Sequence, residues 1–140
     1  MTSPAPLRLV IDTNVVVAAL LHPGRTPDLV LESLRARAAT ILVDSRIEAE
    51  YRAVLSRAKF AALPLARRST MLAALLDRAE RVACAPFAHA MIDDDDRAFV
   101  EVARSGRADA LITGNAKHFP IELGVTVLSP AALLARLERL

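Results

Sequence analysis

Short apolar runs alternate with helical patterns along this chain of 140 residues. The runs at 7–11, 41–43, 110–112 and 125–127 are rich in Val, Ile and Leu and too short for helices, so they predict buried strands. Between and after them, apolar residues recur every three or four positions, which predicts helices. Strands that alternate with helices predict an α/β fold of three layers, in which helices cover both faces of a mostly parallel sheet of four or five strands.

Start signals mark two of the expected helices. Pro27 and Asp28 open the first of these, and Pro130 opens a last amphipathic helix. The segment 22–27 between apolar stretches predicts a turn. Apolar residues at helical spacing complete the pattern: Leu31, Leu34 and Ala38; Ile47, Tyr51, Val54, Leu55 and Ala58; Leu72, Leu75, Leu76, Ala79 and Val82; Phe99, Val100 and Ala103.

Length and composition place the chain among folded globular proteins. Residues 1–140 are expected to form a single domain, with residues 1–6 as a loose tail. A hydrophobic content of 54% argues against disorder. No apolar run reaches the roughly 18 residues of a membrane span, and no secretory signal is recognised. Cys84 has no second cysteine to pair with, so a cytoplasmic location is expected.

Charge and aromatic content limit the choice of partner only weakly. A net charge of +2 is little evidence for nucleic-acid binding by itself. Aromatic residues make up 4% of the chain, which disfavours a base-stacking platform.

Polar residues follow three of the expected strands. Asp12 ends the first, the pair Asp44 and Ser45 ends the second, and the segment 113–115 ends the third. In open α/β sheets the ligand site lies outside the carboxyl ends of the strands, so these residues fall where a site is expected. Each also has a structural interpretation as a helix cap, which applies equally to Thr13 and Asn14.

Two further groups of acids offer candidates. Asp96 is the last of four consecutive aspartates, 93–96, and lies one helical turn before Phe99, so one or two of the four are expected to be functional and the others solvated. Glu48 and Glu50 flank the apolar stripe of their helix at similar angles on opposite sides. Periodicity therefore does not choose between these two glutamates.

Carboxylates gathered in one pocket require a compensating charge. Mg²⁺ or Mn²⁺ supplies it, because hard cations prefer oxygen ligands, and such an ion can polarise a phosphodiester. His22, His89 and His118 are scattered rather than set at zinc-like spacing, which disfavours zinc. The chain contains neither a glycine-rich phosphate loop nor a G-x-S-x-G elbow.

Four segments form a recognisable set of motifs: Leu9-Val-Ile-Asp-Thr-Asn-Val15, then 48–60 (EAEYRAVLSRAKF), 93–99 (DDDDRAF) and 108–120 (ADALITGNAKHFP). They resemble the motifs of PIN-domain ribonucleases, the class that includes VapC-type toxins. The last three are similar to the motifs of one toxin-like subgroup. The match runs in order over nearly the whole chain.

The resemblance implies roles for particular residues. Asp12 and Asp96 would be the principal metal ligands, and Glu50 would bind a second ion or orient the attacking water. Asp93 would help to shape the site, and Asp94 and Asp95 would be mainly solvated. Asn115 stands where many relatives carry an aspartate; its carbonyl oxygen can coordinate but adds no charge. His118 replaces another acid, and supporting positions are Thr13, Asn14, Ser45 and Thr113.

The function implied by the resemblance is that of a Mg²⁺- or Mn²⁺-dependent endoribonuclease that cuts single-stranded or looped RNA. Water would attack phosphorus directly and leave 5′-phosphate and 3′-hydroxyl ends. The resemblance also implies a toxin role, a cognate antitoxin and a homodimer. Phosphate contacts are expected from basic residues on or after the Glu50 helix, each of which is equally an ordinary solvated side chain: Arg46, Arg52, Arg57 and Lys59.

Two other functions remain open at this stage. Asn115 motivates a non-catalytic PIN module that binds RNA or a protein partner. The second open function is that of a phosphate-transfer protein with an aspartyl nucleophile. Asp12 lacks the second aspartate that the common phosphatase motif places two residues on, where this chain has Asn14.

Overall fold

The computed structural model of the chain describes residues 6–57 and 60–139, and its centre is a sheet of five parallel strands. The spatial order is β3-β2-β1-β4-β5, and every neighbouring pair is parallel. The strands are β1 (Arg8–Ile11), β2 (Thr40–Val43), β3 (Glu80–Arg81), β4 (Ala110–Ile112) and β5 (Val127–Leu128). The predicted α/β fold with a sheet of four or five strands is confirmed.

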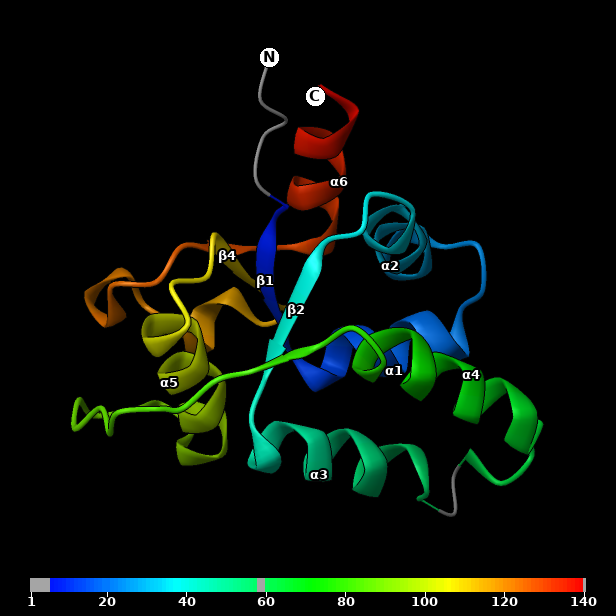
Figure 1. Cartoon of the computed structure of the whole chain (residues 1–140), viewed down its shortest axis with the longest axis horizontal. Coiled ribbons are helices and arrows are strands. Elements are labelled where there is room, and N and C mark those ends of the chain that lie inside the picture. Colours follow the sequence, from blue (N-terminus) through cyan, green and yellow to red (C-terminus); the bar gives the residue numbers. More distant parts are fainter. Residues whose placement is uncertain (1–5, 58–59, 140) are drawn as a thin grey trace.

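Helices cover both sides of this sheet (Figure 1). Helix α5 packs against β1, β2 and β4, while α2 and α6 pack against each other on the opposite side of the strands. Helix α3 lies beyond the end at which β2 finishes, and α4 packs against α1 and α3. The α-helices are α1 (Thr13–Leu21), α2 (Thr26–Ala36), α3 (Ser45–Leu55), α4 (Leu65–Leu76), α5 (Arg97–Ser105) and α6 (Pro130–Glu138), and short 3-10 turns are η2 (Asp94–Asp96), η3 (Ala116–His118) and η4 (Ile121–Leu123).

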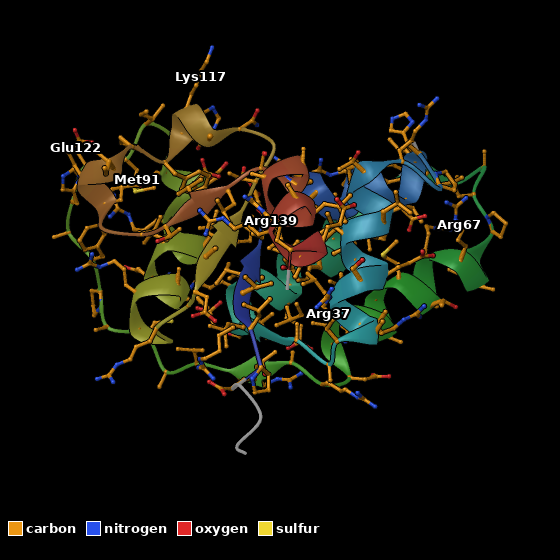
Figure 2. The ribbon with its side chains drawn as sticks, turned by 90° about the horizontal axis from the view of Figure 1, so that it is seen from above. Arg37, Arg67, Met91, Lys117, Glu122 and Arg139 are labelled. Atoms are coloured by element: carbon orange, nitrogen blue, oxygen red, sulfur yellow. The ribbon has the colours of Figure 1, made fainter. Side chains whose placement is uncertain are left out.

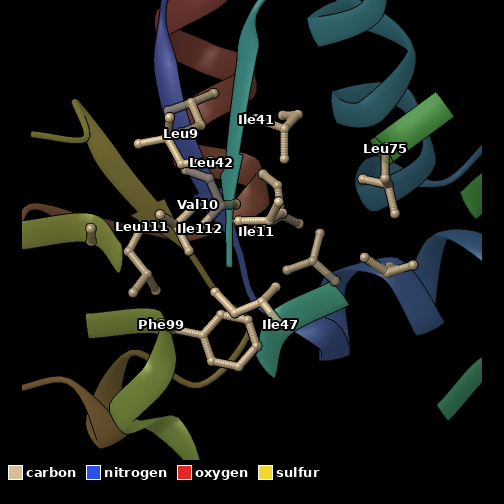
Figure 3. Packing of buried hydrophobic residues seen from close by; sticks show 14 of the residues in the cluster. Leu9, Val10, Ile11, Ile41, Leu42, Ile47, Leu75, Phe99, Leu111 and Ile112 are labelled. Carbon is tan, nitrogen blue, oxygen red and sulfur yellow. The ribbon is translucent and has the colours of Figure 1, made fainter. Parts of the chain in front are cut away.

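The core explains why the strands are almost wholly apolar. Side chains of β1 and β4 are buried on both faces of the sheet, as parallel strands with helices on each side require. Leu111 and Ile112 are fully buried, and Ile47 of α3 and Phe99 of α5 close the core where the strands end (Figure 3). The core thus reaches up to the carboxyl edge of the sheet and holds that edge rigidly.

Strand register brings two of the polar strand ends together. Ile11 of β1 is opposite Ile112 of β4, so the residues after them are neighbours. The backbone N–H of Asp12 donates to the carbonyl of Ile112, at 2.9 Å. Asp12 and Thr113 therefore leave the sheet side by side.

Several predicted boundaries need correction. The helix expected through Ala79 and Val82 ends at Leu76, and the chain then forms the two-residue edge strand β3. This strand depends on pairing with β2, because Val82 N–H donates to the carbonyl of Val43, and a strand so short leaves no periodic signal. The last strand is 127–128 rather than 125–127.

Smaller details follow from the chain ends and turns. Ala38 lies beyond the end of α2 with a positive φ of 54°, so it is not part of the predicted helical face. Ala58 and residues 1–5 of the expected tail lie outside the described residues, while Pro6 is exposed and irregular. Among the described helices, none combines the length and the apolar character needed to cross a membrane.

Tyr51 ties α3 to the central strand. Its side chain is fully buried, and its hydroxyl donates to the carbonyl oxygen of Ile11. Burial, followed by the charges of Asp12 and Glu50, raises the pKa of Tyr51 far above its usual value. The hydroxyl therefore stays protonated and keeps donating to the end of β1.

We expect Tyr51→Phe to lower the free energy of unfolding by about 1–2 kcal/mol, because the carbonyl of Ile11 loses its donor inside the core. Urea unfolding followed by circular dichroism measures this change. An unchanged unfolding midpoint would show that the hydroxyl contributes nothing to the attachment of α3.

Candidate functional site

A cleft of about 460 Å³ opens at the carboxyl end of the sheet, between α1, α3 and the start of α5. Its lining combines most of the acids expected from the sequence with apolar side chains. The polar lining residues are Asp12, Thr13, Asn14, Glu50, Asp93, Asp95 and Asp96, the apolar ones include Val17, Leu21 and Val54, and Arg57 and His22 also line the cleft.

Asp12 is buried at the end of β1, with 7% of its surface exposed. The Thr113 hydroxyl donates to its Oδ2 at 2.7 Å, and the backbone N–H of Asn115 donates to the same Thr113 hydroxyl at 3.0 Å. Burial raises the pKa of Asp12, although the hydrogen bond from Thr113 opposes that shift. Asp12 precedes α1 without a geometrically regular side-chain cap bond, although the backbone N–H groups of Asn14 and Thr13 also act to lower its pKa.

The two residues that follow Asp12, Thr13 and Asn14, connect the surrounding elements. The buried hydroxyl of Thr13 donates to Oε2 of Glu50, which joins the start of α1 to α3. The side-chain oxygen of Asn14 accepts from the N–H of Gly114 at 3.1 Å, which joins α1 to the loop after β4. These bonds hold Glu50 and the β4 loop against the buried aspartate.

Asp96 forms a second acidic centre with two neighbours. Its side chain is 13% exposed, and Nδ1 of His118 lies 3.1 Å from its Oδ2. Ligand atoms of Asp93, Asp96 and His118 all lie within 4.8 Å of one another, and no other such group of three is found within residues 6–57 and 60–139. Burial, followed by the charge of Asp12, raises the pKa of Asp96 to about 6.

The other aspartates of the run behave as solvated residues. Asp94 is 79% exposed and pairs with Arg97 at 2.7 Å on the surface. Asp95 is also exposed, although it lines the rim of the cleft. Their exposure agrees with the expectation that only part of the run faces the site.

The structure separates the two glutamates that periodicity left equivalent. Glu50 lines the cleft and accepts from Thr13. Glu48 faces away and pairs with Arg52 at 3.3 Å and Arg81 at 3.1 Å. Only Glu50 is therefore placed near the buried aspartate.

Other candidates lie outside the cleft. Ser45 is exposed and lines a separate depression of about 690 Å³, and Asn115 is exposed and does not line the cleft. Arg46 pairs with Asp44 and with Glu101, each at 2.7 Å.

The remaining basic candidates differ in position. Arg52 pairs with Glu48 outside the cleft. Arg57 is exposed and lines the cleft, whereas Lys59 lies outside the described residues.

The sequence analysis did not identify the apolar wall of the cleft, which consists of Val17, Leu21 and Val54. Val17 and Leu21 of α1 face the cleft with Val54 of α3, and Leu21 is 44% exposed. Their spacing from Thr13 places them on the same face of α1, which was the available signal. The wall gives the cleft an apolar surface beside its acids.

The acids lack a fixed positive counterpart. Within the described ranges, neither arginine nor lysine forms an ion pair with Asp12, Glu50 or Asp96. Lys117, next to His118, extends from η3 away from the body of the protein (Figure 2). Carboxylate oxygens without a paired arginine or lysine suit a hard divalent ion, and the pKa values of Asp12 and Asp96 are raised. The donor set therefore fits Mg²⁺ or Mn²⁺.

Comparison with known proteins gives two findings. Residues 8–117 match a family model described as a PIN domain. A chain in the crystal structure of VapBC2 from Rickettsia felis, bound to a DNA fragment from their promoter, superposes with a TM-score of 0.59 at 21% identity, covering 88% of this chain and 98% of that chain. No curated protein gives a significant match.

We expect Asp96→Asn to stabilise the metal-free protein at pH 7 by about 1–3 kcal/mol and to have little effect at pH 4. The Asp96 pKa is raised from 3.8 to about 6 in the folded state, so ionisation costs stability as the pH rises through that interval. Urea unfolding in EDTA at both pH values measures the difference.

Asp94→Asn is the matched control, because Asp94 is exposed and its surface pair contributes little at either pH. If Asp96→Asn changed the free energy of unfolding equally at pH 4 and pH 7, the ionised Asp96 would not be the source of the lost stability.

Proposed function

The chain belongs to the PIN domain family, and from this premise we propose that it is a metal-dependent endoribonuclease that hydrolyses RNA phosphodiester bonds. The observation that carries the proposal is the convergence of Asp12, Glu50 and Asp96 on one cleft, where no arginine or lysine in the described part of the chain pairs with them. We further propose that it acts as the toxin of a toxin–antitoxin pair.

The proposed cofactor is Mg²⁺ or Mn²⁺, held mainly by Asp12 and Asp96. When bound, the ion supplies positive charge that polarises the phosphodiester and stabilises the charge developing on its oxygens. Thr113 orients Asp12 by donating to one carboxylate oxygen, which leaves the other oxygen for the ion. Asp96 presents its carboxylate to the same cleft from the start of α5.

Glu50 is proposed to orient and deprotonate the attacking water. Thr13 donates to one oxygen of its carboxylate, so the side chain is held in place while the second oxygen can accept from water. Direct attack by water requires no 2′-hydroxyl nucleophile, and the products carry 5′-phosphate and 3′-hydroxyl ends.

Substrate contacts are proposed for both sides of the cleft. Arg57 lies on the rim, where its guanidinium can contact a phosphate next to the cleaved bond. Val17 and Leu21 offer an apolar surface for a base or ribose edge. A single strand suits this open cleft, because its bases are free to turn toward the apolar wall.

A cognate antitoxin is the proposed protein partner. Support comes from the motifs of toxin-like relatives and from the likeness to a chain of VapBC2, which is solved as a complex on DNA. A cytoplasmic location and a homodimer belong to the same proposal.

The first test compares Glu50→Gln with Glu48→Gln. We expect Glu50→Gln to lower the rate of RNA cleavage by about 100-fold or more, because a carboxamide cannot take the proton from the attacking water. Glu48→Gln should stay within about twofold of wild type, since Glu48 pairs with arginines outside the cleft. Cleavage of a mixed panel of single-stranded and looped RNAs is measured in Mg²⁺ or Mn²⁺ and in EDTA.

Control variants make this test decisive. Asp96→Asn should abolish cleavage and Asp94→Asn should not, which also excludes a contaminating nuclease. If well-folded, antitoxin-free wild type cleaves no RNA in either metal, the non-catalytic binding module becomes the better interpretation. Equal losses in Glu48→Gln and Glu50→Gln would contradict the role given to Glu50.

A separate prediction concerns Arg57. We expect Arg57→Ala to weaken binding of single-stranded RNA several-fold and to reduce the dependence of log affinity on log salt by about 0.7, the value of one lost phosphate contact. Arg52→Ala is the matched control, because Arg52 pairs with Glu48 outside the cleft. Fluorescence anisotropy of labelled RNA bound to the inactive Asp96→Asn protein measures both. An unchanged salt slope in Arg57→Ala would remove Arg57 from the substrate path.

A further inference from the structure

His118 stands at the edge of the acidic cleft, in contact with one of its principal carboxylates. Its ring nitrogen Nδ1 is 3.1 Å from Asp96, and a carboxylate oxygen of Asp93 completes a group within 4.8 Å. Two ligands on opposite sides of an ion are about 4.2 Å apart when each metal–ligand distance is about 2.1 Å. Small side-chain rotations therefore allow all three to reach one ion.

The backbone positions these three side chains firmly. His118 ends η3, where its N–H donates to the carbonyl of Asn115, and the next residue, Phe119, is buried in the core. Asp93 accepts from the N–H of Asp95 through Oδ1 and so fixes the turn η2 that leads into Asp96. Two turns from distant parts of the chain thus present the group.

A neutral nitrogen ligand has a specific advantage here. Asp12, Glu50, Asp93 and Asp96 already concentrate negative charge in or beside the cleft. Another carboxylate would add repulsion, whereas an imidazole adds a donor without a charge. Imidazole also binds transition-metal ions better than it binds Mg²⁺, which prefers oxygen ligands.

We propose that His118 and Asp93 are further ligands of the divalent ion that Asp96 helps to hold, with an imidazole nitrogen of His118 bound directly, so that the cleft prefers Mn²⁺ to Mg²⁺. The inference rests on the proposed function in that this ion belongs to the nuclease cleft. It goes beyond that function by naming a nitrogen ligand and the metal that this ligand selects.

The test is metal binding, measured without RNA. Pulsed EPR of the Mn²⁺-loaded full chain detects coupling to a directly bound ¹⁴N nucleus, and titration calorimetry gives the affinities for Mn²⁺ and Mg²⁺. We expect a ¹⁴N coupling and at least tenfold tighter binding of Mn²⁺. His118→Gln should remove the coupling and weaken Mn²⁺ binding about tenfold, with Mg²⁺ binding changed less than threefold.

Two further variants separate coordination from a loss of structure. His118→Asp replaces the nitrogen ligand by an oxygen ligand. This variant should therefore bind an ion without ¹⁴N coupling and with a reduced preference for Mn²⁺. His89→Gln is the matched control, because His89 is exposed, contacts the carbonyl of Ala90 and lies outside the cleft. Its coupling and affinities should equal those of wild type.

The outcomes distinguish this inference from the proposed function. Metal-dependent RNA cleavage without ¹⁴N coupling in wild type would overturn the histidine ligand and leave the nuclease intact. Coupling that persists in His118→Gln would also overturn it, by assigning the nitrogen elsewhere. Coupling lost only in His118→Gln and His118→Asp, in a protein that cleaves no RNA, would support the site and reject the nuclease.

Discussion

The burial of the Asp12 carboxylate at the end of the central strand is the constraint on which the arrangement of the polar residues around the cleft depends. Asp12 is 7% exposed and has no fixed cation beside it among the described residues. A carboxylate in that position is costly unless hydrogen bonds or a metal compensate it. Thr113 offsets part of that cost, and the charge of Asp12 adds to the effect of burial in raising the pKa of Asp96. A bound divalent ion would lower the free-energy cost of the charges on both Asp12 and Asp96.

Rigid elements hold this unfavourable arrangement in place. Strand β1 lies between β2 and β4 in the middle of the sheet, and α5 packs across all three. Tyr51 fastens α3 to the last residue of β1, and Thr13 fastens Glu50 to the start of α1. Sites built on such supported strand and helix ends keep their geometry without a ligand. The stability lost at the acids is the expected cost of a functional site.

Much of the fold could be predicted because its signals are local. The strands β1, β2 and β4 are buried on both faces, so each appears as a continuous apolar run. Asp12 was recognised because it follows such a run directly. Asp96 became a candidate because it precedes Phe99 by one helical turn at the start of α5, and the resemblance to PIN-domain motifs selected it from the four aspartates. The edge strand β3 was missed because pairing with β2, not its own pattern, makes it a strand.

The sequence by itself determined the fold class, the strand ends that carry acids and, through its motifs, the family. Only the tertiary structure decided which side chains share a cleft. Glu48 and Glu50 flank the same apolar stripe, and before the structure only the resemblance to a family motif favoured Glu50. The packing of α3 against α1 places Glu50 beside Thr13 and leaves Glu48 with Arg81. The path of the loop after β4 likewise brings His118 into contact with Asp96. Such pairings join residues far apart in the chain, and local periodicity carries no information about them.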